Sequence, residues 1–218
     1  MKVVLTGTEG LSAPLAEELE GLGFEVEACP LVAVEPLDGP PLRPEEYDWL
    51  LLTSRNGVEA LFPRLLGSLP RVAVVGRGTA EALREHGIEP DLVAATSTQE
   101  GLSAELPRPA GRVLFAGAED ARDVLVRELG ADFVPLYRTV GLRPERFPDG
   151  DLVVLASASA ARSFAALGLD LPCASIGPVT SAESRARGLC VVVEAETHDR
   201  EGLVEAVKLA ASLGSSPS

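Results

Sequence analysis

The sequence predicts an α/β protein with two domains, each a five-stranded parallel sheet flanked by helices. Short segments rich in Val and Leu recur along the 218 residues, and each leads through a small polar turn into a helical pattern. Segments that are apolar on both faces and alternate with helices are typical of parallel sheets covered on both sides. An internal repeat is the second observation, because it indicates two domains of similar structure.

The expected elements alternate in chain order. Strands are expected at 3–5, 49–52, 72–75, 113–115, 152–155 and 174–176. Helices are expected at 11–22, 56–66, 79–86, 119–129, 159–166 and 179–187. Ser, Thr and Gly between each strand and its helix favour turns and helix N-caps. Glycines that close several of these helices are natural C-caps, because they adopt the left-handed conformation without strain.

The repeat joins four pairs of segments in the same order. Residues 2–31 resemble 112–136, and the later segments 47–61, 71–88 and 96–106 resemble 150–164, 172–189 and 197–207. Chance similarity between α/β units is the alternative, and the shared order of four matches disfavours it. Two similar domains imply a ligand-binding cleft at their interface.

Two segments rich in Pro and Gly, at about 35–44 and 139–149, are expected to be linkers. They divide the chain into a continuous domain at 38–138 and a discontinuous domain made of 1–34 and 146–218. The alternative is two halves in tandem, since the Pro- and Gly-bearing residues 107–111 could also serve as a linker.

The composition narrows the class of protein. A net charge of −14 disfavours binding to nucleic acid or to an anionic membrane surface. No apolar run reaches the roughly 18 residues of a transmembrane helix, and no secretory signal is visible, so a cytoplasmic protein is expected. Cys29, Cys173 and Cys190 are widely spaced and lack a CxxC motif, which favours buried free thiols over a metal site or disulfides.

The residue usage is typical of a thermophile. The chain has one Asn, one Gln and one Met but 17 prolines, and thermophilic proteins contain few thermolabile residues and many prolines in loops. A GC-rich coding bias would produce much of the same pattern.

Ligands of parallel sheets bind at the carboxyl ends of the strands. Here those positions carry hydroxyls, glycines and arginines at helix N-termini, which attract anions. They are Thr53, Ser54, Arg55, Gly76, Arg77, Thr79, Ser157, Ser159, Gly177, Thr180 and Thr197. Any one of the small residues could be an ordinary N-cap or turn residue. As a set facing one cleft, they indicate a site for carboxylates or phosphates. No nucleotide, flavin or metal motif is present, so no cofactor and no metal are expected.

Tyr137 is one of two tyrosines in the chain and ends the last apolar segment before the second linker. Its hydroxyl could donate a proton or a hydrogen bond at the mouth of the cleft. The alternative is an interface anchor with one wet end.

Ordered motifs along the whole chain carry a family resemblance. They are 52–58 (LTSRNGV), 74–80 (VVGRGTA), 100–102 (EGL), the helix with Arg122, 135–140 (PLYRTV), 157–160 (SASA), 175–180 (SIGPVT) and 201–203 (EGL). The chain resembles the uroporphyrinogen-III synthase family. The resemblance implies two flavodoxin-like domains joined by a two-segment linker. It also implies a cofactor-free lyase that cyclises the linear tetrapyrrole hydroxymethylbilane, inverts ring D and releases water to give uroporphyrinogen III for haem-type cofactors.

By this resemblance Tyr137 donates a proton to the departing hydroxyl, while the hydroxyls and glycines above bind the propionate and acetate arms. The eight carboxylates of the substrate fit a net charge of −14 poorly, so the cleft should be locally neutral or positive. The candidate cations are Arg55, Arg77, Arg122, Arg138 and Arg162. The loops at 6–8 and 197–200 depart from the family pattern.

We expect a monomer that meets the preceding pathway enzyme only transiently. The main alternative function is a non-catalytic two-domain protein that binds a small anion. A nucleotide-using transferase is disfavoured because phosphate-binding motifs are absent.

Overall fold

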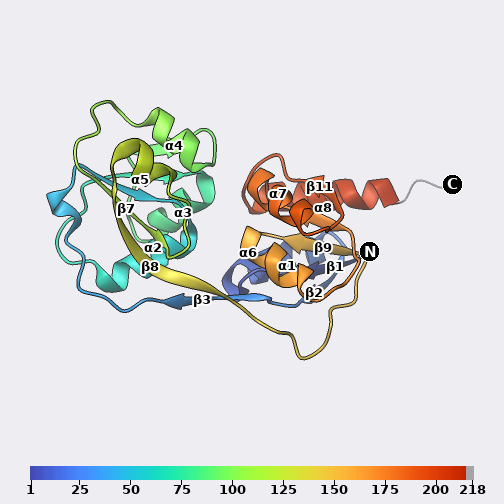
Figure 1. Cartoon of the computed structure of the whole chain (residues 1–218). Coiled ribbons are helices and arrows are strands. Elements are labelled where there is room, and N and C mark those ends of the chain that lie inside the picture. Colours follow the sequence, from blue (N-terminus) through green and yellow to red (C-terminus); the bar gives the residue numbers. More distant parts are fainter. Residues whose placement is uncertain (215–218) are drawn as a thin grey trace. The chain divides into compact units, whose positions relative to one another are not determined.

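The computed structural model describes residues 1–214, which form two compact units (Figure 1). Unit 1 combines residues 1–33 with the chain from Val140 onward, and unit 2 comprises Val34–Thr139. Unit 1 is therefore assembled from two separate segments, whereas unit 2 is one continuous segment. Within residues 1–214, no helix is both long and apolar enough to cross a membrane.

Unit 1 contains a five-stranded parallel sheet with the order β11-β10-β9-β1-β2. Its strands are β1 (Lys2–Leu5), β2 (Glu25–Ala28), β9 (Leu152–Leu155), β10 (Cys173–Ser175) and β11 (Val191–Glu194). Its helices are α1 (Glu9–Gly21), α6 (Ala158–Ala165), α7 (Pro178–Ala186) and α8 (Arg200–Gly214). Read in chain order, the strands have the doubly wound arrangement 2-1-3-4-5.

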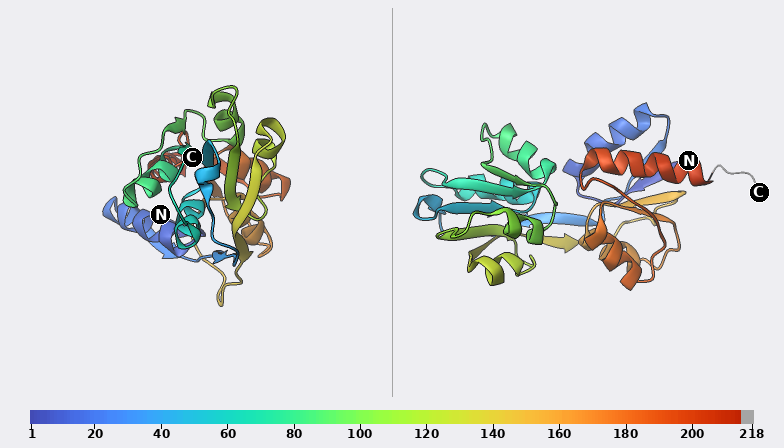
Figure 2. Two further views of the ribbon diagram at one scale, coloured as in Figure 1. Left: turned by 90° about the vertical axis from the view of Figure 1, so that its left-hand side faces the viewer. Right: turned by 90° about the horizontal axis from the view of Figure 1, so that it is seen from above.

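Along the central strands of unit 1, alternate side chains pack on opposite faces of the sheet. Val3 packs with Leu15 of α1 and Leu203 of α8 on one face, and Val4 packs with Phe164 of α6 on the other. Figure 2 shows α1 and α8, in blue and red, on one side of this sheet and the orange helices on the opposite side. A strand buried on both faces needs apolar residues at every position, which explains the uninterrupted apolar runs in the sequence.

Unit 2 contains a six-stranded sheet with the order β3-β8-β7-β4-β5-β6. The strands are β3 (Val32–Pro36), β4 (Trp49–Leu52), β5 (Arg71–Val75), β6 (Leu92–Ala94), β7 (Val113–Ala118) and β8 (Asp132–Gly141). The helices are α2 (Arg55–Leu61), α3 (Arg77–Glu85), α4 (Gln99–Glu105) and α5 (Val124–Leu129). The predicted class, α/β with parallel sheets, is confirmed, and this sheet has one strand more than expected because β3 lies beside β8.

The two units contain the same sheet with the chain permuted. Segments 2–31 and 112–136 supply β1-β2 and β7-β8, and the remaining repeats supply β9–β11 and β4–β6. Matched in this way, the orders β2-β1-β9-β10-β11 and β8-β7-β4-β5-β6 are identical. The equivalent residues Leu31 and Leu136 accept matched hydrogen bonds: Leu142 N donates to Leu31 O at 2.8 Å, and Leu37 N donates to Leu136 O at 2.9 Å.

The expected linker at 35–44 is packed on unit 2. Buried Leu42 receives a hydrogen bond from Leu66 N at 2.8 Å and donates from its own N to Arg64 O at 2.7 Å. The Arg64 guanidinium donates to Pro135 O at 3.0 Å and to Pro40 O at 3.3 Å. One arginine side chain thus joins this segment to β8.

Two expected helices are shorter in the structure. The helix expected at 119–129 begins only at Val124, because a turn follows β7, in which Glu119 N donates to Tyr137 O at 2.8 Å and Ala121 N donates to Ala118 O at 3.0 Å. The helix expected at 56–66 ends at Leu61 and continues as a 3₁₀ turn at Phe62–Arg64. Pro63 causes this change, because it has no N–H to continue the α-helical hydrogen bonds.

We expect residues 34–139 to fold cooperatively as an isolated fragment and to be more stable than residues 45–137. The shorter fragment loses β3 and buried Leu42, and burial of one Leu side chain stabilises by about 1.5–3 kcal/mol. Urea unfolding followed by circular dichroism measures the difference. Residues 1–110 lack β7 and β9, the central partners of β4 and β1, and should not fold. A cooperative, protease-resistant 1–110 fragment would contradict this division.

Candidate functional site

In each sheet there is one pair of adjacent strands whose following helices pack on opposite faces of the sheet. In unit 1 these strands are β1 and β9, followed by α1 and α6. In unit 2 they are β7 and β4, followed by α5 and α2. Such switch points leave a crevice outside the carboxyl ends of the strands, where doubly wound sheets bind ligands. The loops that follow these strands are therefore the first place to seek the site.

Tyr137 and Ser54 meet at the switch point of unit 2. The phenol oxygen lies 2.8 Å from Ser54 Oγ, and the Tyr137 side chain is buried, with 5% of its surface exposed. Ser54 is the N-cap of α2 and accepts a hydrogen bond from Gly57 N at 3.0 Å. The expected catalytic residue is thus hydrogen-bonded to an expected substrate-binding residue.

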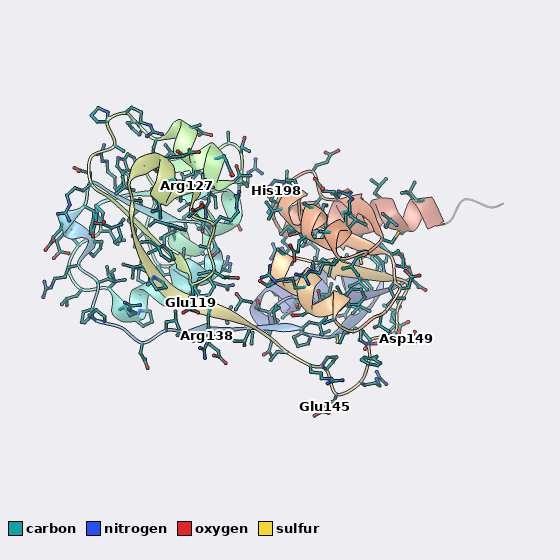
Figure 3. The ribbon with its side chains drawn as sticks, in the orientation of Figure 1. Glu119, Arg127, Arg138, Glu145, Asp149 and His198 are labelled. Carbon is teal, nitrogen blue, oxygen red and sulfur yellow. The ribbon has the colours of Figure 1, made fainter. Side chains whose placement is uncertain are left out.

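A register shift places Tyr137 at this point. The pairing of β7 with β8 is regular from Leu114 to Gly117, then Ala118 pairs with Tyr137 instead of Leu136. Irregularities of this kind redirect side chains near functional sites. The hydrogen bond from Glu119 N to Tyr137 O follows directly and holds the start of the β7–α5 loop against β8. Figure 3 labels Glu119 at the end of β7 and Arg138 on β8.

The surroundings keep the Tyr137 phenol protonated. Burial raises its pKa, the hydrogen bond from Ser54 lowers it, and the negative charge of Asp120 raises it. The net effect is a pKa above the ordinary value of a phenol, so Tyr137 carries its proton throughout the neutral range. The sequence does not indicate this role of Asp120, because its proximity to Tyr137 depends on the pairing of β7 with β8.

Helix N-caps match between the two units. Ser157 accepts from Ala160 N at 3.1 Å as Ser54 accepts from Gly57 N. Thr98 accepts from Gly101 N at 3.0 Å, and Asp199 accepts from Gly202 N at 2.9 Å. The phenol has no such match, because the segment 29–32 (CPLV) corresponds to 134–137 (VPLY) and places Val32 where unit 2 has Tyr137.

The first turns of α3 and α7 have no side-chain cap. Both helices are nine residues long and follow a glycine, Gly76 in unit 2 and Gly177 in unit 1. A Cβ on Gly76 would meet Ser97 Oγ, and a Cβ on Gly177 would lie 2.6 Å from His198 Cδ2. Figure 3 labels His198 in the loop before α8. These glycines let the loop after the last strand approach the helix N-terminus, whose amides carry no hydroxyl cap.

Four of the five candidate arginines have partners within their own unit. Arg122 and Glu100 form a bidentate pair with distances of 2.5 and 3.0 Å, which lowers the pKa of Glu100. Arg138 Nη2 lies 2.6 Å from Glu35 Oε2. Arg162 donates to Ser159 Oγ at 2.9 Å and lines a pocket between α6 and α7 with Glu183.

Arg55 and Arg77 differ in whether an ion pair already neutralises the guanidinium charge. Arg55 donates to Glu85 at 2.7 and 3.0 Å. Glu85 ends α3, so this pair lies at the opposite end of α3 from Gly76. Arg77 is exposed in the first turn of α3 and has no ion pair within residues 1–214. Of the candidate cations, Arg77 is the one placed at an uncapped helix N-terminus.

The remaining predicted residues lie in the loops and first helical turns that follow the carboxyl ends of the strands. Thr79 and Thr180 are buried in the first turns of α3 and α7. Thr197 donates to Asp199 Oδ1 at 2.8 Å, and Thr53 Oγ1 lies 3.8 Å from the Cβ position of Gly117. The structure therefore groups Thr53, Ser54 and Tyr137 in unit 2, whereas Ser159 and Thr197 serve local contacts in unit 1. Within residues 1–214, no three His, Cys, Asp or Glu side chains form a metal-binding group.

The model of the family described as "Uroporphyrinogen-III synthase HemD" matches residues 13–205. The chain belongs to the uroporphyrinogen-III synthase family. A uroporphyrinogen-III synthase from Synechococcus elongatus is 28% identical over 247 aligned positions, which cover 94% of each chain. The resemblance inferred from the ordered motifs is thereby confirmed.

Solved structures of this family share the fold. A mutant uroporphyrinogen III synthase from Thermus thermophilus gives a TM-score of 0.62 at 18% identity, covering 98% of this chain and 99% of the other. A uroporphyrinogen-III synthetase from Helicobacter pylori gives 0.65 at 16% identity, with coverage of 97% and 99%. The α/β architecture with parallel sheets is therefore that of the uroporphyrinogen-III synthase family.

The repeated Glu-Gly-Leu motif yields a prediction. A Cβ on Gly202 would collide with Thr197 O, and a Cβ on Gly101 would collide with Thr96 O. Overpacking against backbone typically costs about 1–3 kcal/mol, so Gly202→Ala and Gly101→Ala should each lower the free energy of unfolding by that amount. Chemical denaturation of each variant measures the loss.

Gly10→Ala is the matched control for these two variants. Gly10 is also helical, and a Cβ there would meet nothing within 4 Å. The substitution should be neutral or stabilise by up to about 1 kcal/mol, as Gly-to-Ala changes in helices do. Equal stability of Gly202→Ala and Gly10→Ala would contradict the close approach of the loop.

Proposed function

We propose that this chain catalyses the cyclisation of hydroxymethylbilane to uroporphyrinogen III, a lyase reaction with inversion of ring D and loss of water. The observation that carries the proposal is the buried, protonated Tyr137 hydrogen-bonded to Ser54 at the switch point of unit 2. Membership of the uroporphyrinogen-III synthase family supports the same reaction.

The chemistry of the helix N-termini suits a substrate with eight carboxylates. The first turns of α3 and α7 offer backbone N–H groups without a side-chain cap, and such amides bind anions without a charged side chain. Arg77 adds an exposed cation beside the α3 amides. We propose that the other arginines contribute little, because Arg55 and Arg122 already neutralise Glu85 and Glu100.

In the proposed step Tyr137 Oη gives its proton to the hydroxyl of the hydroxymethyl group. The C–O bond breaks with assistance from the pyrrole nitrogen lone pair, water leaves, and a cationic azafulvene remains. Asp120 is close enough to influence the Tyr137 phenol electrostatically, so its carboxylate would also stabilise this cation. In the proposed closure, the ring D carbon that already bears the bridge to ring C attacks the azafulvene and forms a spiro intermediate. The bond between that carbon and the bridge then breaks, which frees the bridge as a second azafulvene and lets ring D turn over. The free α-carbon of ring D attacks this azafulvene and loses its proton, and this proton restores the phenol.

Correct orientation of the bound substrate supplies much of the remaining rate enhancement. Hydroxymethylbilane also closes without an enzyme, and then gives the isomer with ring D not inverted. The protein must hold the chain with the correct carbon near the azafulvene, and well-oriented reactions gain about 7–11 kcal/mol from such positioning. The proposed reaction therefore requires a site that binds many carboxylates and contains one proton donor.

The proposal is tested by incubating the purified protein with freshly prepared hydroxymethylbilane, oxidising the products and separating the isomers chromatographically. We expect isomer III well above the spontaneous isomer I. Binding without formation of isomer III would instead support an anion-binding protein.

Tyr137→Phe should lower kcat by about tenfold to a hundredfold. General acid assistance is typically worth about 10²–10⁴-fold, and this leaving group departs readily from an electron-rich pyrrole, so the loss falls at or below the low end. Tyr47→Phe is the control, because Tyr47 donates to Asp132 at 3.0 Å outside the site. Turnover by Tyr137→Phe equal to that of Tyr47→Phe would remove Tyr137 from the mechanism.

A further inference from the structure

We propose that Ser54 positions Tyr137 and stabilises its phenolate, rather than binding a carboxylate of the substrate. This inference rests on the proposed function, because it gives Ser54 a task in the same proton transfer. It changes the role expected for Ser54 from the family resemblance, where it was grouped with the residues that bind the acid arms.

Ser54 Oγ makes two hydrogen bonds within the protein, one with Gly57 N and one with Tyr137 Oη. A serine hydroxyl has one hydrogen and accepts through its lone pairs. The Gly57 N–H, at 3.0 Å, occupies one of the two lone pairs of Ser54 Oγ. The contact of 2.8 Å to Tyr137 Oη therefore uses the Ser54 hydrogen whenever the phenol directs its own hydrogen to the substrate. In that arrangement Ser54 has no hydrogen left for a carboxylate.

The burial of Tyr137 makes this partner hard to replace. The ring packs in the cluster that contains Leu52, Val58 and Leu136, and 5% of the side-chain surface is exposed. A phenolate formed there needs a donor, because an unpaired charge in an apolar site is costly. Asp120 is the charged group that acts on Tyr137, and its sign disfavours the phenolate. Ser54 is the group that lowers the pKa of Tyr137.

Unit 1 contains an internal control for this pair. Ser157 occupies the place of Ser54 and makes the same cap, accepting from Ala160 N at 3.1 Å. Val32 stands where unit 2 has Tyr137. A serine-to-alanine change at either position removes an equivalent helix cap and lowers stability to a similar extent. Only the change at residue 54 also removes a partner of a phenol.

The direct test uses the titration of Tyr137 itself. The chain has two tyrosines, so a Tyr47→Phe protein made with 3-fluorotyrosine carries one ¹⁹F label, at residue 137. We expect Ser54→Ala to move the titration of this resonance to higher pH, because the phenolate loses its donor. Ser54→Thr keeps a hydroxyl and should restore the parental titration, and Ser157→Ala should not move it. An unchanged titration in Ser54→Ala, or an equal shift in Ser157→Ala, would overturn the proposal.

Kinetics with hydroxymethylbilane separate positioning from binding. Ser54→Ala should lower kcat by about threefold to tenfold, where tenfold corresponds to about 1.4 kcal/mol, with KM changed less than about twofold. Ser54→Thr should recover most of the lost kcat. A rise in KM at parental kcat would make Ser54 a carboxylate-binding residue and overturn the proposal. The ¹⁹F titration needs no substrate, so it remains decisive even if the proposed reaction fails.

Discussion

The whole structure depends on backbone pairing between strands that lie far apart in the sequence. Val3 of β1 pairs with Leu152 of β9, and this contact unites the two segments of unit 1. Side chains reinforce it: Thr6 Oγ1 donates to Val154 O at 2.7 Å in a buried position, and Lys2 N donates to Asp151 Oδ2 at 2.7 Å. The same pairing creates the switch point, so the sheet that closes unit 1 also sets where a ligand can bind.

A duplicated scaffold with different residues at matched positions suits an asymmetric substrate. The N-cap serines 54 and 157 are equivalent, yet only unit 2 places a phenol beside its serine. The uncapped helices also differ, since Arg77-Gly78 in unit 2 corresponds to Pro178-Val179 in unit 1, and Val179 is exposed. The duplication keeps the amide-rich edges in both units, and in the proposed reaction the substitutions assign proton transfer and the cation to unit 2.

The sequence predicted what depends on local pattern and missed what depends on distant contacts. The strands 49–52 and 152–155 have their predicted bounds, because uninterrupted apolar runs mark strands buried on both faces. The peripheral strands β2 and β11 contain Glu and are partly exposed, so no fully buried apolar run marks them. β3 lies in a Pro-bearing segment whose pairing with β8 no local pattern indicates.

In the candidate site, too, local features can be predicted from the sequence and contacts between distant residues cannot. The spacing of the sequence indicates the hydroxyls and glycines at strand ends, since most of them lie in or next to the first turn of a helix. The pairing of Arg122 with Glu100, and of Arg55 with Glu85, joins residues 22 and 30 positions apart. These partners follow from tertiary packing, so the charge available to a substrate could not be judged from the number of arginines.

We propose that backbone amides at the carboxyl edge of each sheet bind carboxylates of the substrate. Hydrogen exchange of the protein with and without uroporphyrinogen III, kept under anaerobic conditions, tests it most directly. We expect the ligand to slow exchange in the first turns of α3 and α7 together, with little change at the amino ends of the strands. Slowed exchange in one unit alone, or at the amino ends, would contradict the claim.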